Sequence, residues 1–234
     1  SLPAVLPRRP HVINGSSIKF VNNSASEYGG AIYLNNRFYG YGSTPFNSSQ
    51  KGFIINGVDV SFINNSAGNG GVISINKDDD FNGNGGLTYI NNTLFESNVA
   101  VNGSTIFNEC NLTIEESDFV SNVASNNGTI WNAGNLNVYS SYFENNNASY
   151  GGVINNIGNL TVNNSKFSNN KGYSIYNTLG YYDLEYYEDV NLTGYADILN
   201  SEFNGDSVVY NKGYIYSSNN TVVSDDNYFI FYYE

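Results

Sequence analysis

A repeat of 24 residues constrains the fold of this chain more than any other feature. Four apolar positions recur at this spacing along the middle of the chain: Phe95, Phe119, Phe143 and Phe167; Ile106, Ile130 and Ile154; Leu112, Leu136 and Leu160; and Ile114, Val138 and Val162. A fixed period of this length is typical of architectures in which each unit stacks on the one before it.

Each unit contains three short apolar runs, illustrated by residues 135–138, 143–146 and 151–154. These runs have the length of strands rather than helices. The chain also holds 24 Gly and 21 Tyr but no Met, a composition poor in helix formers. The sequence therefore predicts an all-β, right-handed single-stranded parallel β-helix of seven to eight coils, each of about 24 residues with three short strands. The hand follows from the right-handedness of parallel crossovers.

The chain divides into a short N-terminal segment and one repeat domain. Residues 1–11 hold three of the four prolines and two of the three arginines, which predicts a linker or cap, and residues 12–234 form the β-helix domain. The Phe spacing lengthens to 42 before Phe62, 33 before Phe95 and 36 before Phe203. We therefore predict inserted loops at 37–52, 77–85 and 178–189, all following the third strand and lining one edge.

Two columns of Asn are expected to be structural. In six repeats an Asn stands three residues after the Phe and should form a ladder at one turn, through Asn23, Asn65, Asn98, Asn122, Asn146 and Asn170. A second column is expected after the Ile strand, at Asn35, Asn76, Asn108, Asn132, Asn155, Asn177 and Asn211. Glycines before that strand should supply a positive φ at a tight corner: Gly30, Gly71 and Gly152.

The inserted loops carry the candidate binding residues. Tyrosine and phenylalanine suit stacking on sugars or protein surfaces, which indicates a partner-binding set of Phe38, Tyr39, Tyr41, Phe46, Tyr181, Tyr182, Tyr186 and Tyr187. The alternative is that these rings only cover the flanks of the coils.

The second loop resembles the start of a calcium loop. Asp78, Asp80 and Asn82 occupy its first, third and fifth positions, with Gly83 at the sixth. Tyr89 stands where the bidentate Glu of such a loop belongs, so a solvated acidic loop is the alternative. No cofactor is expected to be required, and Ca²⁺ is the candidate ion.

Charge and side-chain chemistry exclude several functions. Nine Lys and Arg against 21 Asp and Glu give a formal charge of −12, which disfavours nucleic acid. No apolar run is long enough for membrane insertion. We expect no enzyme and no catalytic residues, because His11 is the sole histidine and the arginines lie outside the repeat strands. A polysaccharide lyase or hydrolase, using acids within 183–189, is the alternative.

The paired motifs at 20–23 (Phe-Val-Asn-Asn) and 29–32 (Gly-Gly-Ala-Ile) resemble repeats of the chlamydial polymorphic outer-membrane autotransporter proteins. They are also similar to those of adhesin-like surface proteins of methanogenic archaea. The resemblance implies a secreted, extracellular adhesin on the cell surface that attaches to a glycan or protein of another cell. Thirteen Asn-x-Ser/Thr sequons make glycosylation a further candidate property.

A structural role is the remaining alternative. The apolar residues 228–233 could pair with a following unit or another chain, because a coil stack presents unpaired strands at both ends. This predicts self-association end to end, as in a filament-forming repeat protein.

Overall fold

The computed structural model describes residues 10–35, 51–77, 86–182, 190–205 and 208–223. These residues form strands and turns, and no helix occurs among them. The prediction of an all-β chain is therefore confirmed for the described part. Within the same ranges, no helix has the length and apolar character needed to cross a membrane.

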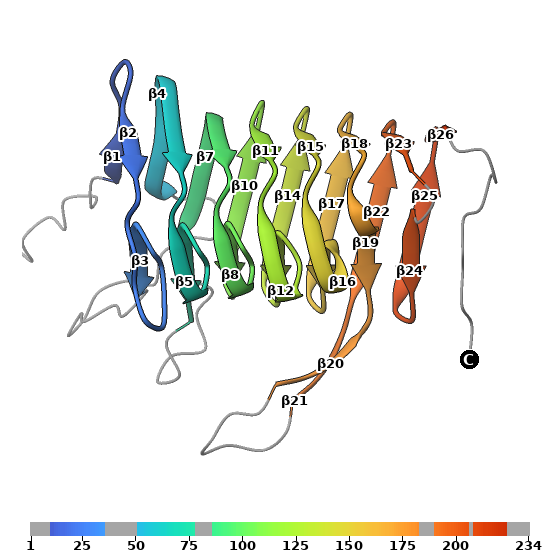
Figure 1. Ribbon diagram of the computed structural model, residues 1–234. Coiled ribbons are helices and arrows are strands. Elements are labelled where there is room, and N and C mark those ends of the chain that lie inside the picture. Colours follow the sequence, from blue (N-terminus) through green and yellow to red (C-terminus); the bar gives the residue numbers. More distant parts are fainter. Residues whose placement is uncertain (1–9, 36–50, 78–85, 183–189, 206–207, 224–234) are drawn as a thin grey trace, which may run out of the picture.

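The strands fall into two large sheets of stacked, parallel strands (Figure 1). The first sheet contains 14 strands. Its members are β1 (His11–Ile13), β2 (Lys19–Val21), β4 (Lys51–Ile63), β7 (Leu87–Glu96), β10 (Asn111–Glu115), β11 (Asp118–Val120), β14 (Asn135–Tyr139), β15 (Tyr142–Glu144), β17 (Asn159–Asn163), β18 (Lys166–Ser168), β22 (Tyr195–Leu199), β23 (Glu202–Asn204), β25 (Tyr214–Ser218) and β26 (Thr221–Val223).

The second sheet contains 10 strands. Its members are β3 (Ile32–Asn35), β5 (Ser66–Asn69), β6 (Ile73–Asn76), β8 (Val99–Asn102), β9 (Ile106–Asn108), β12 (Val123–Asn127), β13 (Ile130–Asn132), β16 (Asn147–Asn156), β19 (Lys171–Asn177) and β24 (Val209–Asn211). A hairpin of β20 (Leu179–Tyr182) and β21 (Val190–Thr193) stands apart from both sheets as the one antiparallel pair between the named strands.

Several repeats contain a strand that the sequence did not predict. The run Val123–Asn127 forms β12, so the repeat that contains β10, β11, β12 and β13 has four strands instead of three. In β16 and β19 the corresponding third and fourth strands are continuous. The extra strand was missed because only one of its side chains, Ala124, is buried, which leaves a weak apolar signal.

Stacking in register places equivalent residues above one another. Phe119 pairs with Phe95 on one side and with Phe143 on the other, and the six rings from Phe62 to Phe203 are fully buried. Adjacent rings of the Phe column lie 4.6–5.3 Å apart between centroids, with interplanar angles of 2–12°. Each repeat thus hides its largest apolar side chain between two copies of itself.

The corner glycines differ from the prediction. In each Gly-Gly pair the first glycine has the positive φ, and the second was predicted to have it. The observed residues are Gly29, Gly70 and Gly151, and the predicted ones were Gly30, Gly71 and Gly152. An added Cβ at Gly70 would lie 2.2 Å from a backbone carbonyl oxygen. At Gly71 the obstacle is close approach instead, because a Cβ would meet the carbonyl oxygen of the next repeat at 2.2 Å. Both positions are constrained, for different physical reasons.

Candidate binding site at the insertion edge

The Asn residues that follow each Phe form a continuous hydrogen-bonded column. In every pair the backbone N–H and the side-chain Nδ2 of one Asn donate to Oδ1 of the Asn in the next repeat, at 2.8–3.1 Å. The column comprises Asn23, Asn65, Asn98, Asn122, Asn146 and Asn170. We call it the Asn ladder.

Asn122 shows how completely one rung is satisfied. Its Oδ1 accepts from the backbone N–H and from Nδ2 of Asn98, each at 2.9 Å. Its Nδ2 donates to the Phe95 carbonyl at 2.9 Å and to Asn146 Oδ1 at 3.0 Å. The side chain is fully buried, so these bonds offset the cost of removing an amide from water. The rung therefore holds the turn in place and leaves no polar group free for a ligand.

The second Asn column differs from the prediction at two positions, Asn155 and Asn76. Its side-chain bonds run through Asn108, Asn132, Asn156, Asn177 and Asn211 at 2.7–2.8 Å. Asn155 points out of the column and donates to Asn127 instead. The column also stops before Asn76, because Asn108 stands opposite Ile75, while Asn76 pairs in register with Asn35. Strand alternation explains why Asn156, and not Asn155, belongs to the column, since neighbouring residues of a strand face opposite sides.

The points where the insertions leave the stack lie at equivalent positions. The chain exits after β3, β6 and β19, all members of the Ile strand, and returns at β4, β7 and β22. Figure 1 shows the β20–β21 hairpin projecting from the lower edge of the stack. We call this side the insertion edge.

A pocket of about 720 Å³ lies at the base of this hairpin. The hairpin contributes Leu179 and Thr193, and the last two repeats contribute the rest: Tyr195, Ala196, Asp197, Asn211, Lys212, Gly213, Tyr214, Ile215 and Tyr216. Its volume falls in the range of small-molecule and sugar sites, and its lining mixes apolar surface with a few polar groups. The pocket is therefore a candidate binding site on the described surface.

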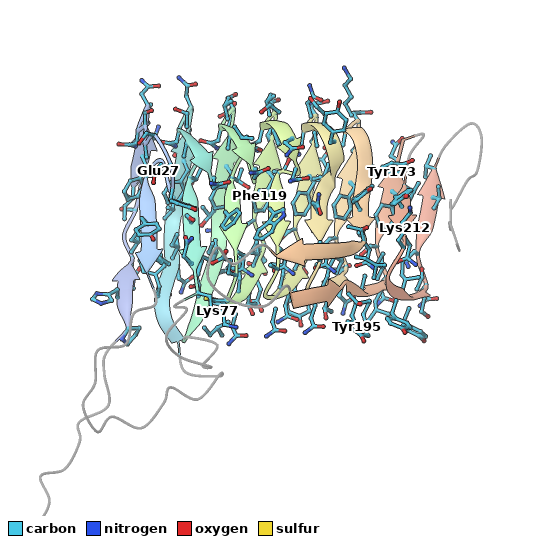
Figure 2. The ribbon with its side chains drawn as sticks, turned by 90° about the horizontal axis from the view of Figure 1, so that it is seen from below. Glu27, Lys77, Phe119, Tyr173, Tyr195 and Lys212 are labelled. Carbon is cyan, nitrogen blue, oxygen red and sulfur yellow. The ribbon has the colours of Figure 1, made fainter. Side chains whose placement is uncertain are left out.

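Four outward side chains form one wall of the pocket. Tyr195 and Asp197 on β22 pair in register with Tyr214 and Tyr216 on β25. We call these four residues, three tyrosines and one aspartate, the Tyr quartet. The rings of Tyr195 and Tyr214 stack at 5.0 Å with an angle of 15°. The three tyrosines remain 51–63% exposed, which leaves ring surface accessible to a ligand. In Figure 2, Tyr195 projects from the outside of the stack, whereas Phe119 lies within it.

Neighbouring residues fix the shape of the pocket. Nδ2 of Asn211 donates to the Gly213 carbonyl at 2.9 Å, and its Oδ1 accepts from Asn177. These bonds hold the turn that carries Lys212, whose Nζ lies 6.0 Å from the centroid of the Tyr210 ring. The pocket thus combines exposed tyrosine rings with one carboxylate and one ammonium group, a set suited to polar ligands with flat apolar faces.

The predicted binding residues lie mostly outside the described residues. This applies to Phe38, Tyr39, Tyr41, Phe46, Tyr186 and Tyr187, and also to the metal candidates Asp78, Asp80 and Asn82. Tyr181 and Tyr182 lie in β20, where their backbones pair with Asn191 and Val190. Within the described ranges, no three His, Cys, Asp or Glu residues are grouped closely enough to hold a metal ion.

A second group of outward aromatic side chains lies along the Ile strands. Phe107 stacks on Trp131 at 4.2 Å, and Tyr176 stacks on Tyr210 at 4.5 Å. Burial is the main cause that raises the pKa of Tyr176, followed by its neighbour Tyr210. All four rings are buried or half-buried, unlike those of Tyr195 and Tyr214, so this group acts as a small satellite core rather than a binding platform.

Sequence reasoning missed Tyr195 and Tyr214. They occupy the register position held by Asn in the preceding three repeats, Asn111, Asn135 and Asn159. A change from Asn to Tyr at one position of the repeat is the signal that could have found them.

The comparisons with known proteins add no relative. No family model matches the sequence, and neither the curated proteins nor the solved structures contain a match.

Proposed function

We propose that this chain is an adhesin-like, right-handed single-stranded parallel β-helix that acts outside the cell, at the cell surface. In this proposal it attaches to a glycan or protein of another cell through its insertion edge. The stacked repeats provide a rigid support, and the loops and pocket along one edge provide the contact, a division common in binding proteins.

The pocket beside the Tyr quartet is the observation that carries the proposal. It lies on the edge where the insertions emerge, and three of its tyrosines are more than half exposed. Tyrosine offers a large contact area and a hydroxyl at low entropic cost, which makes it frequent in recognition surfaces. A buried structural pocket would not leave these rings open to solvent.

The composition of the pocket favours binding over hydrolysis. Asp197 is the one carboxylate among its described lining residues. Glycoside hydrolysis ordinarily uses two carboxyl groups placed on either side of the scissile bond. The proposed site therefore holds its ligand without cleaving it.

Binding to glycan arrays and to whole microbial cells tests the proposal, and the products in solution are analysed for sugar fragments. The variant Tyr195→Ser with Tyr214→Ser should lose binding, because it removes both stacked rings. Tyr150→Ser is the matched control, since Tyr150 is 72% exposed and lies on β16, outside the pocket lining. Equal binding by the two variants would contradict the proposed site, and released fragments would indicate an enzyme.

A further inference from the structure

The wall of the pocket continues as a regular polar surface along the stack. Behind Tyr195 the same register position holds Asn159 and Asn135, and behind Asp197 it holds Thr161 and Asn137. All four side chains lie on the outward face of β17 and β14 and are at least partly exposed. We call these four residues the Asn–Thr lane.

Two of the three amides of the lane, those of Asn159 and Asn135, are held in fixed positions. Nδ2 of Asn159 donates to Oδ1 of Asn135 at 2.7 Å, and Nδ2 of Asn135 donates to Oδ1 of Asn111 at 2.7 Å. An amide nitrogen carries two hydrogens, so each of these bonds leaves a second N–H for another acceptor. The lane therefore presents prearranged donors and acceptors at the spacing of the repeats, about 4.8 Å.

Charge limits the ligands that this surface can hold. The four side chains of the lane are uncharged, and the chain as a whole carries a formal charge of −12. A polyanionic chain, such as a sulfated or uronic-acid polymer, would be repelled by this field. The lane instead matches a neutral chain whose units carry groups that both donate and accept hydrogen bonds.

We propose that the Tyr quartet and the Asn–Thr lane together bind a linear, neutral glycan bearing acetamido groups, with its chain parallel to the stacking axis. The inference rests on the proposed function and names its ligand. One sugar unit stacks on the tyrosines, and the following units lie over successive repeats. Their acetamido groups pair with the amides and hydroxyls of the lane, because an acetamide supplies one donor and one acceptor.

Binding of chitin oligosaccharides, from the disaccharide to the hexasaccharide, tests this arrangement by calorimetry. Successive units of chitin are turned by about half a turn, so every second unit added over the lane should tighten binding about threefold to tenfold, the value of one net hydrogen bond. Cello-oligosaccharides, which lack the acetamido group, should show a smaller gain, and hyaluronan tests the effect of charge.

Two sets of variants separate the lane from the quartet. Asn137→Leu with Thr161→Val should keep the affinity for the disaccharide and lose the gain with length. The single variant Thr161→Ser retains the hydroxyl and the native Asn137. It should therefore keep part of the gain with length that the double variant loses. Tyr214→Ser should weaken the binding of every oligosaccharide.

The outcomes distinguish the inference from the proposed function. The inference is overturned if the affinity for oligosaccharides does not depend on their number of sugar units. It is also overturned if the increase in affinity with length persists in the variant Asn137→Leu with Thr161→Val. Neither result contradicts the proposed attachment to a cell surface. Attachment to cells or to charged glycans without affinity for chitin oligosaccharides likewise overturns the inference alone. Absence of binding to every array and cell surface overturns the proposed function as well.

Discussion

Replacing Asn122 by Ala should destabilise the protein strongly, because the change strands three buried polar groups. The backbone N–H and one amide N–H of Asn98 lose their acceptor, and the Phe95 carbonyl loses its donor. A buried group without a partner costs about 1–3 kcal/mol. Allowing for partial relaxation, the expected loss in the free energy of unfolding is about 3–5 kcal/mol.

Urea unfolding followed by circular dichroism measures this loss, with Asn159→Ala as the control. Asn159 is exposed and its amide donates one bond, so its replacement should cost no more than about 0.5 kcal/mol. A loss for Asn122→Ala within about 1 kcal/mol of the control would refute the assignment of the turn's stability to the ladder.

Asn122→Asp provides a second test at constant volume. The new carboxylate would face two acceptors, the Phe95 carbonyl and Asn146 Oδ1, in a buried site. Burial and these acceptors favour the protonated acid, so its pKa in the folded state should rise above the usual value of about 3.9. The variant should therefore be least stable, relative to the native protein, at neutral pH. The deficit should shrink as the pH falls through the raised pKa.

Three further predictions concern the core, a corner and a titration. Phe119→Ala should lower the free energy of unfolding by about 3–5 kcal/mol in the same assay, because the ring is fully buried between two others. Gly70→Ala should lower the melting temperature, whereas Gly52→Ala, with its nearest neighbour at 3.6 Å, should not. The pKa of Tyr89 is raised to about 12, mainly by burial and secondly by the hydrogen bond that its hydroxyl donates to Glu115 Oε2 at 2.5 Å. This contribution to stability is present below pH 10 and lost as the pH rises towards 12, so Tyr89→Phe should flatten that part of the stability profile.

The sequence was sufficient to predict an all-β architecture of stacked, parallel strands. The Phe spacing determines which residues meet, since a column of identical rings requires equal chain length between rungs. It does not determine which member of an adjacent pair faces inward. Three corner glycines were therefore assigned incorrectly, because one left-handed residue decides each corner. Asn155 was assigned to the column in place of Asn156, because strand alternation decides that case.

The candidate site was less accessible to sequence reasoning. Its lining comes from the hairpin base and two successive repeats, so residues on either side of 183–189 in the sequence meet in space. Tyr195 and Tyr214 are ordinary residues when each is considered alone. They form a candidate binding surface only when the strand register stacks one ring on the other.

The Asn ladder gives the stack a direction. Every rung from Asn23 to Asn146 donates towards the following repeat and accepts from the preceding one where that rung is present. The column is thus a row of aligned dipoles in which no rung can be reversed without placing donor against donor. An additional repeat placed before Asn23 could continue the row only in the same orientation, as a head-to-tail contact.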